Sequence, residues 1–170
     1  MTSRHVLRIE PLTSEAFRPF GDVIEATEST SRRGINAGYA ERYHDLAHID
    51  AAEAGGRPLL NIFRAVPRAL PLQLSEVERH QLGSQTFMPL TPQCFLAVVA
   101  AAGPAPCVDQ LRGFLAAPGQ GVNYARGTWH HPLIALDAGG DFLVIDRGGP
   151  EAAGDCEVMS LIAPEVWVEA

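Results

Sequence analysis

The sequence predicts a single all-β domain, a sandwich or barrel with a few short helices. Many short apolar or alternating runs follow one another along the chain, and turns rich in Gly and Pro separate them; the 170 residues include 16 glycines and 13 prolines. Helical periodicity is almost absent, and short strands between such turns are typical of sandwiches and barrels. No repeat or interdomain linker divides the chain, so residues 1–170 are expected to form one domain.

The composition excludes several classes of protein. Hydrophobic residues make up 46% of the chain and charged residues 19%, as in an ordinary globular protein. The net charge of −7 argues against a nucleic-acid partner, because phosphate binding requires a basic face. No run approaches the ~20 apolar residues of a membrane span, and the N-terminus lacks the apolar segment of a signal peptide. We therefore expect a cytoplasmic protein without a membrane partner.

The three cysteines do not predict a disulfide framework or a zinc site. Their number is odd, whereas a disulfide framework needs cysteines in pairs, and they show no CxxC spacing of the kind found in zinc sites. These residues are Cys94, Cys107 and Cys156.

Short elements open the chain. Residues 6–9 alternate weakly between apolar and polar side chains and predict a first strand. Thr13 or Ser14 can cap a short helix at residues 15–17, which ends before Pro19.

Two polar segments follow. Residues 26–38 are rich in Ser, Thr, Arg, Gly and Asn and predict a long loop that could close over a site. Residues 41–45 are dense in charge but lack metal-ligand spacing, so they predict a solvated loop.

Residues 58–66 predict a strand that ends at Pro67. If Leu60, Ile62 and Arg64 share one face of it, the arginine lies on an apolar face. A buried guanidinium is costly unless it meets an anion, so Arg64 is a candidate clamp for a substrate carboxylate. The alternative is an edge strand whose arginine reaches solvent.

The remaining strands are predicted by apolar runs. Residues 70–74 alternate with period two, whereas residues 94–101 are almost continuously apolar and predict a strand buried on both faces. Further strands are expected at residues 114–117, 133–136, 141–146 and 157–162, followed by a short acidic tail.

The stretch at residues 119–132 concentrates residue types that carry chemistry. Its glycines permit close backbone approach, and its polar and aromatic side chains offer hydrogen bonds and a titratable or metal-binding nitrogen. Successive residues of a strand point to opposite faces, so only one of His130 and His131 can point inward. Trp129 is expected in the core.

The spacing of two polar groups resembles the two sequence motifs of the cupin family. Glutamate stands where the family's first motif has its first histidine, and glutamine where it has its glutamate. The residues that keep the spacing are Glu78, His80 and Gln85 for the first motif and Gly119, Gly127 and His130 for the second. This resemblance implies a cupin-like barrel or jelly roll.

Nearly the whole chain also resembles the ureidoglycolate lyase family of allantoin degradation, a part of purine metabolism. The matching blocks are residues 20–24, 41–46, 78–80, 83–85, 120–124, 129–133 and 141–149. The resemblance implies (S)-ureidoglycolate as the small-molecule substrate, glyoxylate and urea as products, a homodimer, and nickel as the associated metal.

The departures from the cupin motifs leave metal binding open. His80, His130 and Glu78 could bind a divalent ion, with Gln85 as a weak fourth ligand. A site without metal fits these residues equally.

Elimination of urea requires a base, an acid and an anion clamp. His130 or His80 is expected to be the base, with Glu78 as the acidic or orienting partner. The substrate-binding residues are expected to be Arg64, Ser84, Gln85, Asn123 and Tyr124. Two alternatives stay open: a metal-dependent cupin oxygenase or isomerase, and a cupin that binds a small molecule without turnover.

Overall fold

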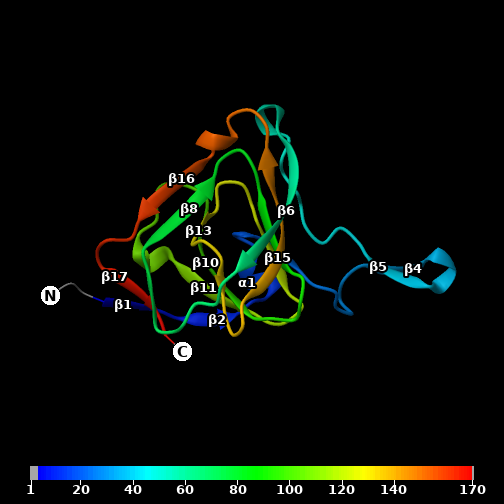
Figure 1. The fold of residues 1–170 in the computed structure, drawn as a ribbon, viewed down its shortest axis with the longest axis horizontal. Helices are drawn as coiled ribbons and strands as arrows, with labels where there is room; N and C mark the ends of the chain where they lie inside the picture. The colour runs from blue at the N-terminus through cyan, green and yellow to red at the C-terminus, as the bar shows by residue number, and fades with distance from the viewer. Residues whose placement is uncertain (1–3, 170) are drawn as a thin grey trace.

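The computed structural model describes residues 4–169, and nearly all of its regular structure is β-strand (Figure 1). Among these residues, no helix is long and apolar enough to cross a membrane. The elements are β1 (Arg4–Leu7), β2 (Ile9–Pro11), α1 (Ser14–Phe17), β3 (Gly21–Ile24), β4 (Arg32–Ile35), β5 (Ala40–Tyr43), β6 (Arg57–Ala65), β7 (Leu72–Leu74), β8 (Glu76–His80), β9 (Gln85–Pro89), β10 (Phe95–Ala100), β11 (Arg112–Ala116), β12 (Gly121–Tyr124), β13 (Trp129–His130), β14 (Ile134–Ala135), β15 (Gly140–Gly148), β16 (Cys156–Ser160) and β17 (Glu165–Val168), with one-turn 3-10 helices η1 (Asn36–Gly38), η2 (Glu53–Gly55), η3 (Val108–Gln110) and η4 (Ala152–Gly154).

Two sheets pack face to face and enclose the main core. One has the strand order β3-β12-β9-β15-β6, and the other has the order β16-β8-β13-β10-β11-β2, with β14 also paired to β10. Aromatic side chains fill the space between them; Phe95 of one sheet meets Phe142 of the other edge to face, with ring centroids 5.5 Å apart. The all-β prediction is therefore confirmed. Within residues 4–169 the strands form separate sheets and not a closed barrel.

A second core lies on the other side of the longer sheet. The small sheet β1-β17-β7 covers it and contributes Leu74, Val166 and Val168. Strand β10 therefore serves both cores: Phe95, Ala97 and Val99 face the first, and the intervening residues face the second. The prediction that this run is buried on both faces is confirmed.

The predicted short helix at residues 15–17 is confirmed, whereas the prediction of only a short acidic tail after residue 162 is wrong. Thr13 caps α1, with its side chain accepting a hydrogen bond from the Ala16 amide. The expected acidic tail instead contains β17, because Val166 and Val168 alternate with Glu165 and Trp167 and are buried against β1 and β7.

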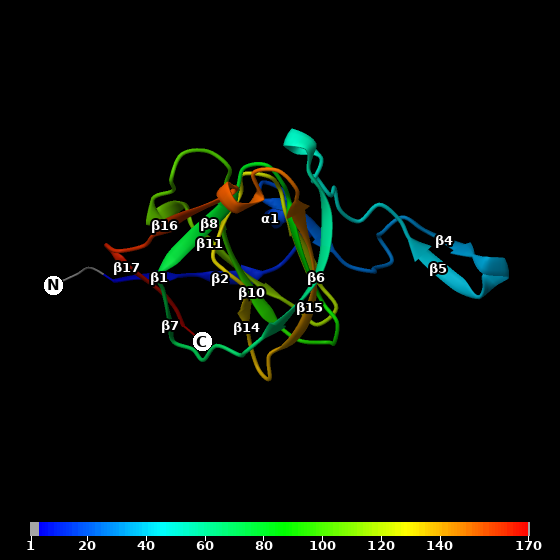
Figure 2. The same ribbon diagram turned by 45° about the horizontal axis from the view of Figure 1, so that its top comes forward.

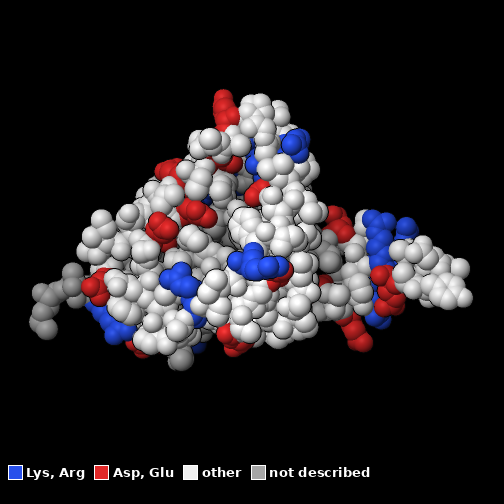
Figure 3. Space-filling view, viewed as in Figure 1, with Lys and Arg blue, Asp and Glu red and all other residues white. Residues whose placement is uncertain are grey.

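The expected long loop at residues 26–38 is also partly wrong. Residues 32–35 pair with residues 40–43, so β4 and β5 form a hairpin whose tip residues Asn36 and Ala37 have positive φ. Figures 1 and 2 show this hairpin projecting away from the two packed sheets, so it does not close over the interior of its own chain. Both basic and acidic side chains lie on it (Figure 3).

Candidate active site

Strand alternation brings three ionisable side chains together between the two sheets. Val77 and Trp129 are buried in the second core, so their neighbours on the same strands point to the opposite side. Those neighbours include Glu78 and His80 on β8 and His130 on β13, and Glu78 lies opposite His130 in the strand pairing. The metal-binding or acid–base atoms of the three residues all lie within 4.8 Å of one another.

His130 is the centre of this cluster. Its side chain is 1% exposed, and its Nε2 lies 3.6 Å from a Glu78 oxygen and 3.1 Å from Oε1 of Gln85. Its Nδ1 lies 3.0 Å from the carbonyl oxygen of Thr128. Because a carbonyl only accepts, Nδ1 carries a proton and Nε2 is the atom that faces the cluster.

The surroundings shift the protonation of the cluster. Hydrogen bonding to His130 lowers the pKa of Glu78, in spite of partial burial of the carboxyl group. Burial, and next the charge of His130, lower the pKa of His80. At neutral pH the site therefore combines an ionised Glu78 with a neutral His80.

His80 supplies the strongest sign that the cluster binds something. Among residues 4–169, its Nε2 is buried and has no hydrogen-bond partner. An unpaired buried nitrogen is costly unless a ligand meets it. Two imidazoles and a carboxylate are a known ligand set for divalent transition metals, so Glu78, His80 and His130 fit such an ion.

Two cavities flank the cluster. The larger, the front cavity, has a volume of about 420 Å³. Its wall combines apolar and polar residues, and it is lined by Phe63, Arg64, Ala65, Val66, Arg68, Glu78, Gln85, Phe87, Pro132 and Leu133. The smaller, the rear cavity, has a volume of about 150 Å³ and includes His80 in its lining.

Gln85 and Tyr124 both contact His130 of the cluster. Gln85 reaches His130, and the Tyr124 ring stacks on the His130 ring with centroids 4.4 Å apart. Burial raises the pKa of Tyr124, so its hydroxyl stays protonated.

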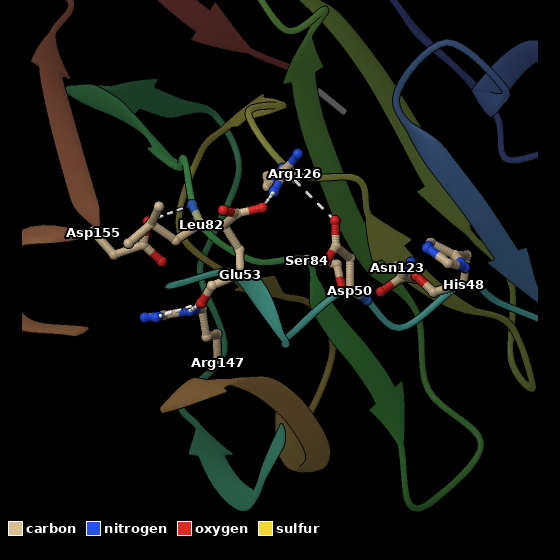
Figure 4. Close-up of polar contacts among 9 residues, drawn as sticks. All are labelled: His48, Asp50, Glu53, Leu82, Ser84, Asn123, Arg126, Arg147 and Asp155. Atoms are coloured by element: carbon tan, nitrogen blue, oxygen red, sulfur yellow. Dashed lines mark hydrogen bonds and ion pairs between the residues drawn. The ribbon is translucent and has the colours of Figure 1, made fainter. Parts of the chain in front are cut away.

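Ser84, which directly precedes β9, and Asn123 of β12 both contact the segment that contains His48 and Asp50 (Figure 4). Ser84 accepts a hydrogen bond from the amide of Asp50, and Asn123 donates to the carbonyl of His48 and to Asp22. Their side chains thus fasten the segment 47–55 across the outside of the sheet. The structure does not bring Asn123 to the Glu78 cluster, whereas Ser84 also lines the rear cavity next to His80.

Arg64 lies on the face of β6 that the sequence indicated, but that face is not apolar core. Leu60 and Ile62 on it are 70% and 51% exposed, and β6 is the edge strand of its sheet. Both oxygens of Asp141 accept hydrogen bonds from Arg64, at 2.8 and 2.9 Å. The anion that balances Arg64 is therefore Asp141. The expectation that Arg64 lies on a buried apolar face, and for that reason needs a substrate carboxylate, is wrong.

His131 is placed apart from the cluster. It is 5% exposed, its Nδ1 lies 2.7 Å from the carbonyl oxygen of Pro132, and burial lowers its pKa. The structure agrees with the expectation that only one histidine of the pair, His130, points inward.

Sequence reasoning missed several residues near the cluster. Cys156 lies 3.4 Å from Glu78, and burial with nearby Glu78 raises the pKa of its thiol to about 11, so it acts as a donor. Arg68 lines the front cavity and forms no ion pair within residues 4–169. Asp146 and Arg147 line the rear cavity. Asp146 could have been found, because it continues the inward alternation of Phe142 and Val144.

Comparison with known proteins places this geometry in a family. A sequence model described as Ureidoglycolate lyase matches residues 4–169. A ureidoglycolate lyase of Burkholderia mallei (strain NCTC 10229) is 55% identical over 143 residues, covering 84% of this chain and 83% of that one. The ureidoglycolate lyase of Burkholderia cepacia is 53% identical over 151 residues (89% and 85% of the two chains), and that of Brucella melitensis biotype 2 (strain ATCC 23457) is 54% identical over 148 residues (85% of each).

One solved structure is also similar, although too weakly to support a conclusion. It is a dTDP sugar isomerase from Desulfovibrio desulfuricans G20, with a TM-score of 0.40 and 16% identity over 82% of this chain and 84% of that one. The sequence matches carry the conclusion: the chain belongs to the ureidoglycolate lyase family.

Proposed function

We propose that this chain is a lyase that converts (S)-ureidoglycolate into glyoxylate and urea in the breakdown of allantoin. Family membership and the names of relatives at about 55% identity support the reaction. The observation that carries the mechanism is the pairing of a neutral His80, whose buried Nε2 has no partner among the described residues, with His130 beside an ionised Glu78.

The reaction needs one proton removed and one proton delivered. The hydroxyl group of ureidoglycolate loses its proton, its oxygen forms the C=O bond of glyoxylate, and the carbon–nitrogen bond breaks. The departing nitrogen takes up a proton and leaves as urea. No water is consumed, so a base and an acid on either side of one carbon suffice.

In the site without a bound ion, we assign the base to His80. Its lowered pKa keeps the imidazole neutral at pH 7, and the lone pair of Nε2 has no competing partner within residues 4–169. We assign the acid to His130, because the two groups that face its Nε2, a Glu78 oxygen at 3.6 Å and Oε1 of Gln85 at 3.1 Å, both accept hydrogen bonds from an N–H group.

As a second arrangement, we propose that Glu78, His80 and His130 would hold a divalent ion, nickel by analogy with the family, in which case His80 would be a ligand and not the base. Imidazole nitrogens and a carboxylate suit nickel, and Thr128 orients His130 through its other ring nitrogen, as is common for metal-bound histidines. Such an ion supplies Lewis-acid stabilisation of negative charge on the substrate oxygens. When His80 and His130 act as ligands, Gln85 and the protonated thiol of Cys156 remain as hydrogen-bond partners for the substrate.

The substrate carboxylate is proposed to bind Arg68 in the front cavity. Arg64 at the same cavity is already neutralised by Asp141, whereas Arg68 forms no ion pair among the described residues. An unpaired guanidinium offers two parallel donors to a carboxylate.

A homodimer is also proposed. The exposed apolar residues Leu60 and Ile62 on edge strand β6 support a partner there, because long exposed apolar edges are otherwise prone to aggregate. Sedimentation of the parent and of Leu60→Glu tests this: a dimeric parent and a monomeric variant are expected, and a monomeric parent would contradict it.

Product analysis tests the reaction. The protein is incubated with (S)-ureidoglycolate, and urea, glyoxylate and ammonia are measured against a protein-free control. Equal amounts of urea and glyoxylate above the control, without ammonia, are expected. Absence of urea above the control would overturn the proposed function.

A further inference from the structure

The rear cavity is lined mainly by residues with polar side chains. It is more enclosed than the front cavity and is lined by His80, Ser84, Asp146, Arg147, Ala152, Asp155 and Cys156. Its volume of about 150 Å³ corresponds to roughly five waters, each occupying about 30 Å³, or to one small organic molecule. Since His80 belongs to the acid–base cluster as well, a molecule in this cavity lies directly beside that cluster.

Arg147 is a buried cation without a carboxylate partner. Its side chain is 7% exposed, and Nε and Nη2 donate to the backbone carbonyl of Glu53 at 3.0 and 2.7 Å, as Figure 4 shows. Nη2 also donates to the carbonyl of Pro150. Across the described residues, Nη1 is buried and has no hydrogen-bond partner, and no carboxylate lies within ion-pair distance.

The chain is built closely around this arginine. A side chain at Gly56 would collide with the Arg147 guanidinium, and one at Gly83 would collide with its Cβ. The two glycines thus let the backbone pack against both ends of the side chain. A position enforced in this way, with one donor left over, indicates a bound acceptor.

Two carboxylates complete the lining. Asp155 is 6% exposed and accepts a hydrogen bond from the amide of Leu82, and Asp146 accepts one from the side chain of Asn61 at 3.0 Å. A carboxylate has about four acceptor positions, so both groups retain capacity to accept from a ligand.

One arginine and two aspartates in the lining favour the ureido group of the substrate over its carboxylate group. A carboxylate ligand offers acceptors only and would be repelled by Asp146 and Asp155. A ureido group offers one carbonyl oxygen for Arg147 and several N–H donors for the two aspartates. Urea has four non-hydrogen atoms, so it also fits the volume.

We propose that the rear cavity is the subsite for the ureido group of the substrate and for the departing urea. Arg147 holds the urea carbonyl oxygen, and Asp146 and Asp155 accept its N–H groups. This inference rests on the proposed function. It orients the substrate with its carboxylate toward Arg68 in the front cavity and its reacting carbon beside His80.

Binding of small probes to the parent protein tests the subsite without turnover. Acetamide and acetate have nearly the same shape, but only acetamide has N–H donors and no charge. We expect urea and acetamide to shift the backbone amide signals of Gly148 and Gly149 in ¹H–¹⁵N spectra, with acetate at equal concentration having little effect. Tighter binding of acetate than of acetamide at these signals would overturn the proposal.

A variant and a matched control locate the effect. Asp146→Asn removes one charged acceptor, and the affinity for urea is expected to fall about tenfold. Asp109→Asn makes the same chemical change at an exposed residue outside the cavity and should leave the affinity within about twofold. Unchanged urea affinity in a folded Asp146→Asn protein would contradict the assignment. If that variant does not fold, the comparison of acetamide with acetate still decides.

The two proposals fail separately. A protein that binds urea at Gly148 and Gly149 but releases none from ureidoglycolate contradicts the proposed function and keeps the subsite. A protein that releases urea but shows no binding of urea or acetamide at these positions contradicts the subsite alone.

Discussion

The imidazole ring of His130 stacks on the phenol ring of Tyr124, with centroids 4.4 Å apart and ring planes 18° apart. Both rings are buried, and Tyr124 extends from the opposite sheet to the one that carries His130. The two sheets therefore meet at the ring of His130, the proposed acid. The orientation of this ring depends on residues of both sheets.

This stacking predicts the effects of two substitutions at Tyr124. Tyr124→Phe keeps the ring and should retain the rate of urea release within about threefold. Tyr124→Leu removes it, and the loss of an aromatic pair worth ~0.5–1.5 kcal/mol should lower both the melting temperature and the rate. Steady-state rates and thermal melts of both variants check this. A Phe variant as impaired as the Leu variant would show that the hydroxyl binds the substrate, as the sequence had suggested.

The adjacent residues His130 and His131 should have different roles, His130 in catalysis and His131 in stability. His130→Asn removes the proposed acid and should lower kcat by ~10²–10⁴-fold. His131→Asn leaves the cluster intact and should mainly lower stability, by about 0.5–1.5 kcal/mol for one lost hydrogen bond. Rates and unfolding free energies of both variants, at equal metal concentration, make the comparison. An inactive His131→Asn variant that is as stable as the parent would contradict it.

The lowered pKa of His80 predicts the acid side of the pH profile. A base must be unprotonated, so kcat/KM should fall as pH drops through a pKa below the ordinary value of 6.5. The same shift means that the unfolded state binds the proton more readily, so stability should also decrease as pH falls below 6.5. A pH–rate profile at constant metal concentration checks the first point. An acid limb centred above pH 6.5 would argue against His80 as the base.

Substitution of the two arginines at the front cavity, Arg64 and Arg68, should have different effects on the KM for the substrate. Arg68→Ala should raise KM about tenfold or more, the effect expected when a charged hydrogen-bond donor to a carboxylate is lost. Arg64→Ala disrupts an exposed ion pair with Asp141 and should change KM by less than about threefold. Steady-state kinetics with (S)-ureidoglycolate distinguish the two. A larger effect at Arg64 would restore it as the clamp.

The sequence predicts those parts of the fold that depend on the pattern of apolar and polar residues within a single strand. The continuous apolar run of β10 indicated burial on both faces, and the alternation around His130 indicated an inward histidine; the structure agrees with both. Strand β17 was missed because its alternation spans only four residues and its partner β1 lies at the other end of the chain.

The site was only partly predictable because residue type does not reveal which face a side chain occupies. Gln85 and Tyr124 point inward, whereas Ser84 and Asn123, one residue away on the same strand regions, hold the segment 47–55 outside. That segment crosses the sheet through contacts between residues far apart in sequence. No local pattern predicts such contacts.

The most direct test of the proposed cluster is urea release by His80→Asn and by the parent, both prepared without metal and with the metal content of each sample measured. The substitution removes the proposed base but leaves Glu78, His130 and the lining residues of the front cavity unchanged. We predict a rate of urea release ~10²–10⁴-fold below that of the parent at equal metal content. A rate within a few fold of the parent at equal metal content would show that His80 does not remove the proton.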